Sequence, residues 1–429
     1  MVQASPEGWL SLAVNTNSEG KAPMKKVALL CMGLAISAVN AAEAQLTMQM
    51  TNGWTFTFAG NVNAFAVYDD VSDGGIASTP GGIVGAGDAL GGKGAFQIRT
   101  GLLPAFAVFD AKGKEGNTDV GVHFGFAPQI QCAYTGGQNP SVNGQGHDCF
   151  GAQIDMRQVF LTVGGSWGQI LAGRELGLYQ RQNILTDQTL FGVGATGGPD
   201  GGGTTLGRIG FGYIYPQFKA QMTYSTPAGR PTQISIGLFQ PATNPPYETV
   251  QLPRVEAEGV YSSGNTKVWV GGLAQNNKTP DTGGGGESAV SWGGTAGVRF
   301  GTPSFSVTGS GYYGKGIGTT LGFLGGAAGA GTGGDDLRKS YGGIGQLTFT
   351  PAESKLTVAG SWGISILDAA DTEAAFKTKN WLASGGVYYQ ATKSLKVVGE
   401  FNYAVTDDDA DGTEKNKEIA PAFGLMLFF

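Results

Sequence analysis

Apolar and polar residues alternate singly along most of the chain after about residue 45. In the segment 54–68 the two kinds of residue separate onto alternate positions. A period of two residues places successive side chains on opposite faces of a β-strand. The segment therefore predicts a strand with one apolar and one polar face. The apolar face would carry Trp54, Phe56, Phe58, Val62, Ala64, Ala66 and Tyr68, and the polar face Thr55, Thr57, Asn61 and Asn63.

The same pattern returns in the segments 95–109 and 118–130. In the first segment, 54–68, the aromatic residues lie towards the two ends, as in strands that cross an outer membrane. No run of about 18 apolar residues occurs, which excludes a transmembrane helix. The expected apolar faces are Phe96, Ile98, Leu102, Phe106 and Val108, then Val120, Val122, Phe124 and Phe126; the expected polar faces are Gln97, Arg99 and Gly101, then Asp119, His123 and Gln129.

Short and long connections alternate between the predicted strands. Short turns facing the periplasm and long loops facing outward are typical of outer-membrane barrels. The pattern predicts an all-β fold, a transmembrane antiparallel up-and-down β-barrel. The short connections are 262–265, 301–303, 350–354 and 392–394, and the long ones are 69–94, 131–151, 175–204, 275–287, 314–338, 367–379 and 407–417.

Parity constrains the number of strands. Separate strands at 206–214 and 217–225 would give 17, which places the chain ends on opposite sides of the membrane. One long strand at 205–225, bent at Pro216, gives 16 and restores the alternation of connections. The last strand, 419–429, ends on alternate apolar positions up to Phe429, an edge that a closed barrel would pair with the first strand.

The amino-terminal region has the features of a secretory signal peptide. Residues 24–26 are Met-Lys-Lys, residues 27–39 are largely apolar, and small residues stand at 42 and 44. This order predicts a cleaved signal at 24–44, preceded by an upstream extension or mis-assigned start at 1–23. The remaining residues, 45–429, would form a single-domain barrel in the bacterial outer membrane.

Cysteine usage and charge narrow the chemistry further. Cys31 lies in the predicted signal, so the exported chain keeps Cys132 and Cys149. An oxidising periplasm favours a disulfide between them, and two free thiols are the alternative. A net charge of −6 argues against a nucleic-acid partner, which would require a basic face.

Neither of the two histidines belongs to a convincing catalytic arrangement, so we expect no enzyme; His123 is expected to be a polar residue of the lumen. Asp407, Asp409, Asp411 and Glu418 have the spacing of a calcium-binding loop. Strands are expected on both sides of this segment, which favours a solvated external loop instead. Such a loop could also meet divalent ions that bridge lipopolysaccharide. No other cofactor is expected.

The run 157–174, RQVFLTVGGSWGQILAGR, resembles the general porins of Gram-negative bacteria. It is similar to the family's fourth strand, tight turn and fifth strand, and the signal peptide and terminal Phe429 also fit. The resemblance implies a 16-stranded barrel, commonly a homotrimer, with a long third loop at about 175–204 folded into the lumen. Residues 190–194 read Leu-Phe-Gly-Val-Gly, a departure from the family's Pro-Glu-Phe-Gly-Gly motif.

Charged residues near the third loop are the candidates for a pore constriction. Facing an arginine towards lipid at mid-depth costs about 2–4 kcal/mol, so the arginines of these strands should face the lumen. The resemblance implies a basic wall opposed by acidic groups of the third loop; the alternative is ordinary lumen charges that pair with one another. Val159, Leu161 and Val163 share a face with Arg157, which leaves the register of that strand open. The basic candidates are Arg99, Arg157 and Arg174, with Arg181 ranked lower; the acidic candidates are Glu175 and Asp187, and the loop also carries Asp200.

These features together predict a water-filled channel for passive diffusion of ions and small hydrophilic solutes. The alternatives are a structural or adhesive barrel whose lumen the third loop closes, a substrate-selective porin, and an outer-membrane enzyme. The expected partners are membrane lipid, lipopolysaccharide and further copies of the chain in a homotrimer.

Overall fold

The computed structural model describes residues 46–72, 79–85, 94–131, 154–197, 203–242, 252–278, 288–320, 326–327, 337–371, 373–409 and 415–429. The predicted signal peptide, both cysteines of the predicted disulfide, Asp200 and Asp411 lie outside these ranges. No helix within them is long and apolar enough to span a membrane.

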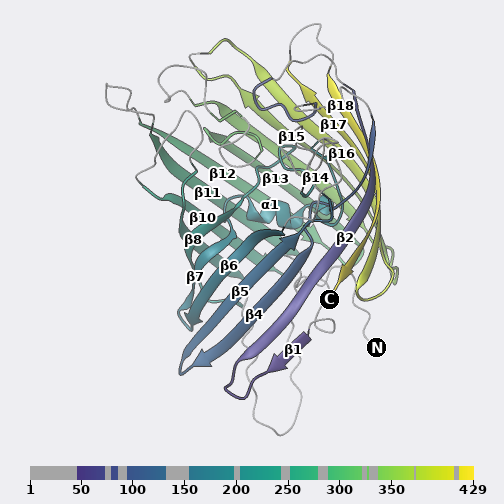
Figure 1. Cartoon of the computed structure of the whole chain (residues 1–429). Coiled ribbons are helices and arrows are strands. Elements are labelled where there is room, and N and C mark those ends of the chain that lie inside the picture. The colour runs from purple at the N-terminus through teal and green to yellow at the C-terminus, as the bar shows by residue number, and fades with distance from the viewer. Residues whose placement is uncertain are drawn as a thin grey trace, which may run out of the picture.

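Nearly all regular structure belongs to one antiparallel sheet that closes on itself (Figure 1). A short helix, α1 (Arg181–Thr186), and a 3-10 turn (Gln188–Phe191) are the exceptions among the described residues. The strands are β1 (Leu46–Gln49), β2 (Thr55–Ser72), β3 (Ala95–Arg99), β4 (Phe106–Glu115), β5 (Thr118–Pro128), β6 (Ile154–Gly165), β7 (Gly168–Leu176), β8 (Phe218–Ser225), β9 (Thr232–Phe239), β10 (Arg254–Ser263), β11 (Thr266–Lys278), β12 (Ser288–Gly301), β13 (Phe305–Lys315), β14 (Lys339–Phe349), β15 (Leu356–Asp368), β16 (Lys377–Gln390), β17 (Leu395–Asp407) and β18 (Asn416–Phe428).

The 18 strands build a wall of 16, which confirms the predicted number. Strand β1 pairs only with the first residues of β2 and adds no position to the wall. Strands β3 and β4 both pair with β2, so they are two parts of one wall strand.

The barrel closes where β18 pairs with β2. Beyond β18, the backbone of Phe429 exchanges hydrogen bonds of 2.8 and 3.0 Å with Gly60. The ring of Phe429 also lies 5.3 Å from the ring of Phe58, centroid to centroid. The terminal apolar strand is therefore paired along its length, and the sheet has no open edge to aggregate.

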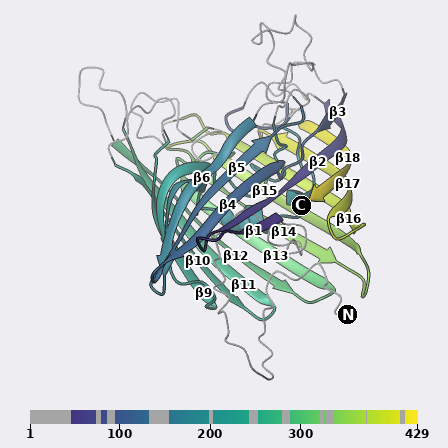
Figure 2. The same cartoon turned by 60° about the horizontal axis from the view of Figure 1, so that its bottom comes forward.

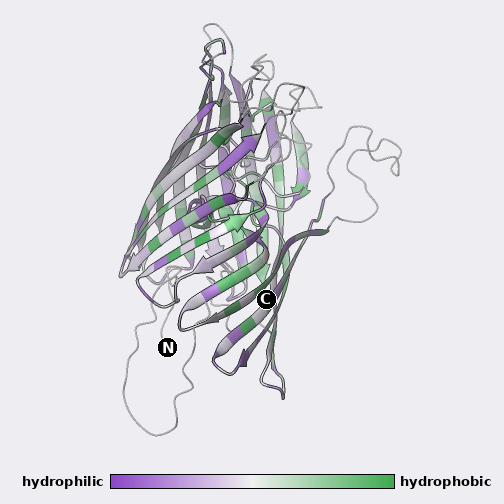
Figure 3. Cartoon of the chain, turned by 90° about the vertical axis from the view of Figure 1, so that its left-hand side faces the viewer, coloured by the Kyte–Doolittle hydropathy of each residue, from purple (hydrophilic) through white to green (hydrophobic). Residues whose placement is uncertain are grey.

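Connections are short at one end of the barrel, the turn end, and longer at the other, the loop end (Figure 2). Apolar and polar residues follow one another in short bands along the strands (Figure 3). In β2 and β5 the burial pattern places the apolar side chains outward, as predicted. Val62 and Val122 are exposed on the outer surface, whereas Asn61 and His123 are buried inside.

The prediction of one continuous face at 95–109 was wrong. Residues 100–105 leave the wall between β3 and β4, and the side-chain amides of Asn61 and Asn63 bond to the carbonyls of Pro104 and Leu103 at 3.1 and 2.9 Å. After this interruption Phe106 pairs with Asn61, an inward-facing residue, so Phe106 also faces inward. Proline, which has no N–H to donate to the sheet, accounts for part of the break. The rest of the expected apolar face follows: Val108 is inward and Leu102 is buried.

The prediction of one strand at 205–225 was also wrong in extent. The wall strand β8 begins at Phe218, and residues 205–217 belong to the third loop, which spans 177–217 rather than 175–204. Ile209, Phe211 and Tyr213 are apolar at alternate positions because they pack inside the molecule, not because they face lipid. Gly210, with φ of 83°, turns the chain between them. Within β8 the predicted alternation is confirmed, since Met222 and Tyr224 face outward and Gln221 and Thr223 inward.

The inner face of the wall is apolar where the third loop packs on it. Phe65 of β2, Val398 of β17 and Met426 of β18 are buried together with Leu190 and Val193 of the loop. The sequence predicts a polar lumen face, but these inward side chains form a core shared with the loop. The interior of the barrel therefore has a packed side, lined by β16–β18 and β2.

Removing Phe429 should weaken barrel closure more than truncating its ring. Deletion removes two hydrogen bonds to Gly60 and the ring contact with Phe58, a loss of about 2–4 kcal/mol. Phe429→Ala keeps the backbone pair and loses about 0.5–1.5 kcal/mol beyond the change in buried area. Urea unfolding in lipid vesicles measures both. Equal losses would show that the backbone pair at Gly60 contributes nothing.

Candidate functional site

The third loop crosses the interior of the barrel, with α1 between the walls (Figure 1). Most of its residues in the described ranges 177–197 and 203–217 are buried. Buried backbone N–H groups cannot bond to bulk water and need partners inside the protein. Many amides of this loop bond to carbonyls of the loop itself. Others bond to carboxylates that project inward from the wall.

Strand β10 holds the first part of the loop through two glutamates. Glu256 accepts hydrogen bonds from the amides of Leu178 and Tyr179 at 2.7 and 2.9 Å. Glu258 accepts from Arg181 Nη2 at 2.5 Å and from the side-chain amide of Gln182 at 3.1 Å. Alternate positions of one strand thus fix the start of the loop and the first turn of α1.

Strands β17 and β18 hold the far part of the loop. Glu400 accepts from the amides of Val193 and Gly194 at 2.7 and 2.8 Å, and Glu418 accepts from the amide of Thr196 at 2.8 Å. A Cβ on Gly192 would lie 2.2 Å from an oxygen of Glu400. A side chain at this position would require the Glu400 carboxylate to move, so glycine suits the close approach of the loop backbone.

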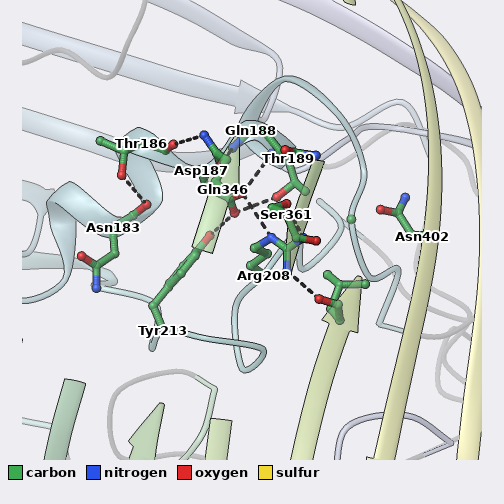
Figure 4. A network of polar contacts seen from close by, with 12 residues as sticks. Asn183, Thr186, Asp187, Gln188, Thr189, Arg208, Tyr213, Gln346, Ser361 and Asn402 are labelled. Carbon is green, nitrogen blue, oxygen red and sulfur yellow. Dashed lines mark hydrogen bonds and ion pairs between the residues drawn. The ribbon is translucent and has the colours of Figure 1, made fainter. Parts of the chain in front are cut away.

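Asp187 and Arg208 join the two halves of the loop at its centre (Figure 4). Arg208 Nε lies 3.7 Å from Asp187 Oδ1, and the hydroxyl of Tyr213 donates to Asp187 Oδ2 at 2.8 Å. Burial, reinforced by Asp187, raises the pKa of Tyr213, so its hydroxyl stays protonated and donates. Burial lowers the pKa of Arg208, and Asp187 opposes that shift.

The same network ties the loop to β14, β15 and β16. Arg208 donates to the carbonyl of Leu382 at 2.8 Å and to that of Ser361 at 3.0 Å. Gln346 accepts from the amide of Gln188 at 2.7 Å and donates to the carbonyl of Thr186 at 3.0 Å. The loop is consequently bonded to the wall along its course, not only where it leaves β7 and rejoins β8.

Segments of two other loops cover the third loop at the loop end. The amides of Ile83 and Val84 donate to Thr406 Oγ1 at 3.1 and 2.9 Å. The amide of Tyr215 donates to the carbonyl of Thr320 at 2.8 Å. Polar inward residues of this half, such as Thr406, are buried beneath these contacts.

Arg99 faces inward, but it lies beneath the third loop and is fully buried. Its Nη1 donates to Gln97 at 3.1 Å, and Asp69 and Glu418 are close enough to interact with its charge. The charge of Arg99 therefore helps to compensate two carboxylates that hold the loop.

Arg157 occupies a β-bulge, which explains the open register of its strand. Gly125 pairs with Gln158 and Phe126 with Met156, so Arg157 is the extra residue. The extra residue changes which positions face inward on its two sides. For this reason simple alternation along the sequence places Arg157 on the face of Val159, Leu161 and Val163. Its Nε donates to Asp155 at 2.8 Å, and its guanidinium lies 5.7 Å from the ring centroid of Phe218.

The prediction that Arg174 faces the lumen was wrong. Arg174 and Glu175 are consecutive residues of β7, and consecutive strand residues face opposite sides. Glu175 faces inward, where its carboxylate accepts from Gln158 at 2.8 Å. Arg174 therefore faces outward, opposite Val159 on β6 and Ala220 on β8.

The candidate constriction residues do not face one another in the way that the resemblance implies. Asp187 lies on the loop as expected, but its charge is paired with Arg208 of the same loop. Glu175 belongs to the end of β7, not to the loop. The resemblance implies acidic groups on the third loop and basic groups on the wall. In this chain the acidic groups lie on the wall, where they accept hydrogen bonds from the loop.

Sequence reasoning missed the residues that fix the loop: Glu256, Glu258, Glu400 and Arg208. A signal was present for the glutamates, since all three stand at inward positions of predicted strands, where an acid needs water or a partner. Arg208 carried no signal, because its segment was assigned to the wall.

The predicted calcium-binding set does not converge in the described residues. Asp407 accepts from Lys415 at 2.6 Å and Asp409 from Lys379 at 2.5 Å, near the loop end. Glu418 points to the interior, where it binds Thr196. His123 faces inward as predicted and lies 3.0 Å from Asp110, Nδ1 to Oδ1.

Replacing Asp187 should destabilise the fold through Arg208. Asp187→Asn leaves a buried guanidinium without its counter-charge, a loss of about 3–5 kcal/mol. Asp119→Asn is the matched control, since Asp119 is part-exposed and 3.8 Å from Lys114, and it should lose under about 1 kcal/mol. Adding Arg208→Gln to Asp187→Asn should recover part of the loss. Urea unfolding in vesicles measures all three; equal losses for the two aspartates would contradict the pairing.

Solved structures that resemble this chain include bacterial outer-membrane proteins. The outer membrane channel DcaP of Acinetobacter baumannii is 15% identical over 89% of this chain and 99% of that chain, with a TM-score of 0.64. The anion-selective porin from Comamonas acidovorans is 12% identical over 88% and 100%, with a TM-score of 0.57. OmpT of Vibrio cholerae is 12% identical over 90% and 100%, with a TM-score of 0.54. No family model and no curated sequence matches the chain. The chain has the fold of these outer-membrane porins.

Proposed function

We propose that the protein is an outer-membrane barrel through which ions and small hydrophilic solutes cross by passive diffusion. The observation that carries the proposal is a closed 16-stranded wall, apolar outside, whose interior the third loop narrows. The wall satisfies its backbone hydrogen bonds without an edge, as a lipid environment requires. The short-turn end would face the periplasm and the loop end the exterior.

Water reaches part of the inner wall on the side of β8–β12. Lys219, Lys267 and Arg299 face inward and are part-exposed, whereas Arg99 and Arg254 are fully buried. Long charged side chains remain hydrated only beside a water-filled space. This region favours a passage over the rival reading, a structural barrel that its loop closes.

We also propose a homotrimer that forms through the outer face of β2–β7. Small residues stand at several outward positions of this face among larger apolar ones, and a second wall could approach closely there. They are Ala64 and Ala66 on β2, Ala107 and Ala111 on β4, and Ala172 on β7.

The outer surface near the loop end suits lipid and lipopolysaccharide. Lys339 and Lys379 face outward, each two residues from an aromatic side chain, Tyr341 and Trp381. Aromatic rings prefer the membrane interface, and lysines just beyond them meet phosphate groups.

A bulky residue on the small-residue face should break the trimer. Ala64→Trp places an indole in the proposed interface, whereas Val270→Trp adds the same ring on β11, on the far side of the barrel. Light scattering of detergent-solubilised protein should give monomers for the first and trimers for the second. Identical masses for both variants would reject this face as the interface.

A thiol facing the passage should make the current sensitive to a bulky charged thiol reagent. Arg299→Cys places the thiol inward, and Val298→Cys places it outward at the next position. In planar bilayers the reagent should reduce the stepwise current of the first variant only, with the unsubstituted chain as control for its own cysteines. If the unsubstituted chain gives no stepwise current, the protein is not a channel. If the two variants are equally sensitive to the reagent, position 299 does not line the passage.

A further inference from the structure

We propose that Arg174 is a contact between subunits, where its guanidinium group lies against the outer wall of a second copy of the chain. The proposal rests on the proposed homotrimer, and it names a residue that holds the copies together. Arg174 is exposed and faces outward from β7, opposite Val159 of β6 and Ala220 of β8. A charged side chain on this outer face needs a partner.

Apolar side chains surround Arg174 on the outer face. Towards the turn end, the next outward residues of the neighbouring strands are Leu161 of β6 and Met222 of β8, both exposed. Towards the loop end, β6 continues past Val159 with the exposed residues Met156 and Ile154. Arg174 therefore lies within the apolar band of the wall, where an arginine that faces lipid is destabilising.

Other outward charges stand in a different setting. Asp70, Lys339 and Lys417 each lie within two residues of the loop end of their strands. Water and lipid headgroups reach the margins of the apolar band, so these charges can remain hydrated there. Arg174 has no such access through its position in the wall.

The described part of the chain offers Arg174 no counter-charge. Within it, Arg174 makes no hydrogen bond and no ion pair with a carboxylate. Its charge interacts with that of Lys219, which is a second cation. The adjacent Glu175 faces inward, where it accepts from Gln158 at 2.8 Å and from the amide of Leu176 at 2.7 Å. A partner on the outer side must come from another molecule.

Lipid phosphate is the more distant source of that partner. The rings of Trp167 and Tyr224 stack at the turn end, and Tyr224 pairs with Ile170, four residues before Arg174. Four residues of a strand tilted as in outer-membrane barrels rise by about 10 Å. Phosphate groups lie beyond such aromatic rows. A second protein wall can contact Arg174 at its own depth.

The outer face of the same chain offers aromatic rings at a comparable place in the sheet. Phe124 of β5 pairs with Val159, which pairs with Arg174, and Phe109 of β4 pairs with Phe124. Phe124 is exposed. A guanidinium group is attracted to the face of an aromatic ring, and more strongly where water is excluded. Aromatic rings can thus receive the charge without a carboxylate.

Threefold symmetry would bring these groups of two copies together. In a closed ring of three, each copy contacts its neighbour through two different parts of its surface. The β7 side of one copy can therefore meet β4 and β5 of the next, which places Arg174 against Phe124 and Phe109 of a second copy. Small residues beside Arg174, Ala172 and Ala220, leave room for the second wall to approach.

Replacing Arg174 by leucine separates the two environments. Leucine suits lipid better than arginine, so at a lipid-facing position Arg174→Leu would leave the trimer unchanged. At a subunit contact the same change should weaken association by roughly tenfold per contact. Light scattering of detergent-solubilised protein over a dilution series measures this, and so does the temperature at which the trimer dissociates. Met222→Leu changes an uncharged outward neighbour and should behave as the unsubstituted chain.

A double-variant cycle tests the aromatic partner. Phe124→Leu should weaken association as Arg174→Leu does, and the combined variant should lose little more than either alone, because the two changes remove one interaction. Additive losses would overturn the assignment of Phe124 as the partner. If Arg174→Leu does not fold, as judged by heat-dependent gel migration, Arg174→Gln takes its place.

The outcomes separate this contact from the rest of the proposed function. An unsubstituted protein that is monomeric overturns the homotrimer and the contact together and leaves the channel, which the current in planar bilayers tests. A trimer that Arg174→Leu does not weaken overturns the contact alone. If that variant instead retains less phospholipid after purification, measured by phosphorus content, Arg174 binds lipid and the contact is equally overturned.

Discussion

The structure depends on one constraint: a loop of about 40 residues inside a barrel must satisfy its backbone polar groups without bulk water. Carbonyls of the loop itself meet part of this need, and glutamates of the wall meet another part. Glu256 and Glu400 each accept hydrogen bonds from two consecutive loop amides, and Glu418 accepts one from the amide of Thr196. Hydrogen bonds to ionised carboxylates are stronger than those between neutral groups, which suits them to position a segment that lacks a sheet ladder of its own.

This constraint also determines where the remaining charges act. The acids that hold the loop cannot also line a passage, and neither can Asp187, which is paired with Arg208. The loop packs on β16–β18 and β2, and the inward cations Lys219, Lys267 and Arg299 stay part-exposed on β8, β11 and β12.

Local alternation was enough to predict much of the fold. In 54–68 and 118–130 each side chain's face depends only on its neighbours in the strand, so the pattern could be read directly. The count of 16 was right, but the reason was not, since residues 206–214 alternate and yet pack inside the barrel. Alternating apolar residues show that one face of a segment is shielded from water. They do not show whether lipid or another part of the protein shields it. The candidate site was less predictable because bulges, loop partners and the choice between Arg174 and Glu175 depend on contacts distant in sequence.

Hydrogen exchange of the segment 192–197 tests the central claim most directly. Its amides at Val193, Gly194 and Thr196 bind Glu400 and Glu418 inside the barrel, so they should exchange as slowly as the amides of the neighbouring strands. Mass spectrometry of the folded protein in detergent or vesicles resolves this segment. Exchange at the rate of an open loop would contradict the account, because it would mean that the wall carboxylates do not hold the loop in the interior.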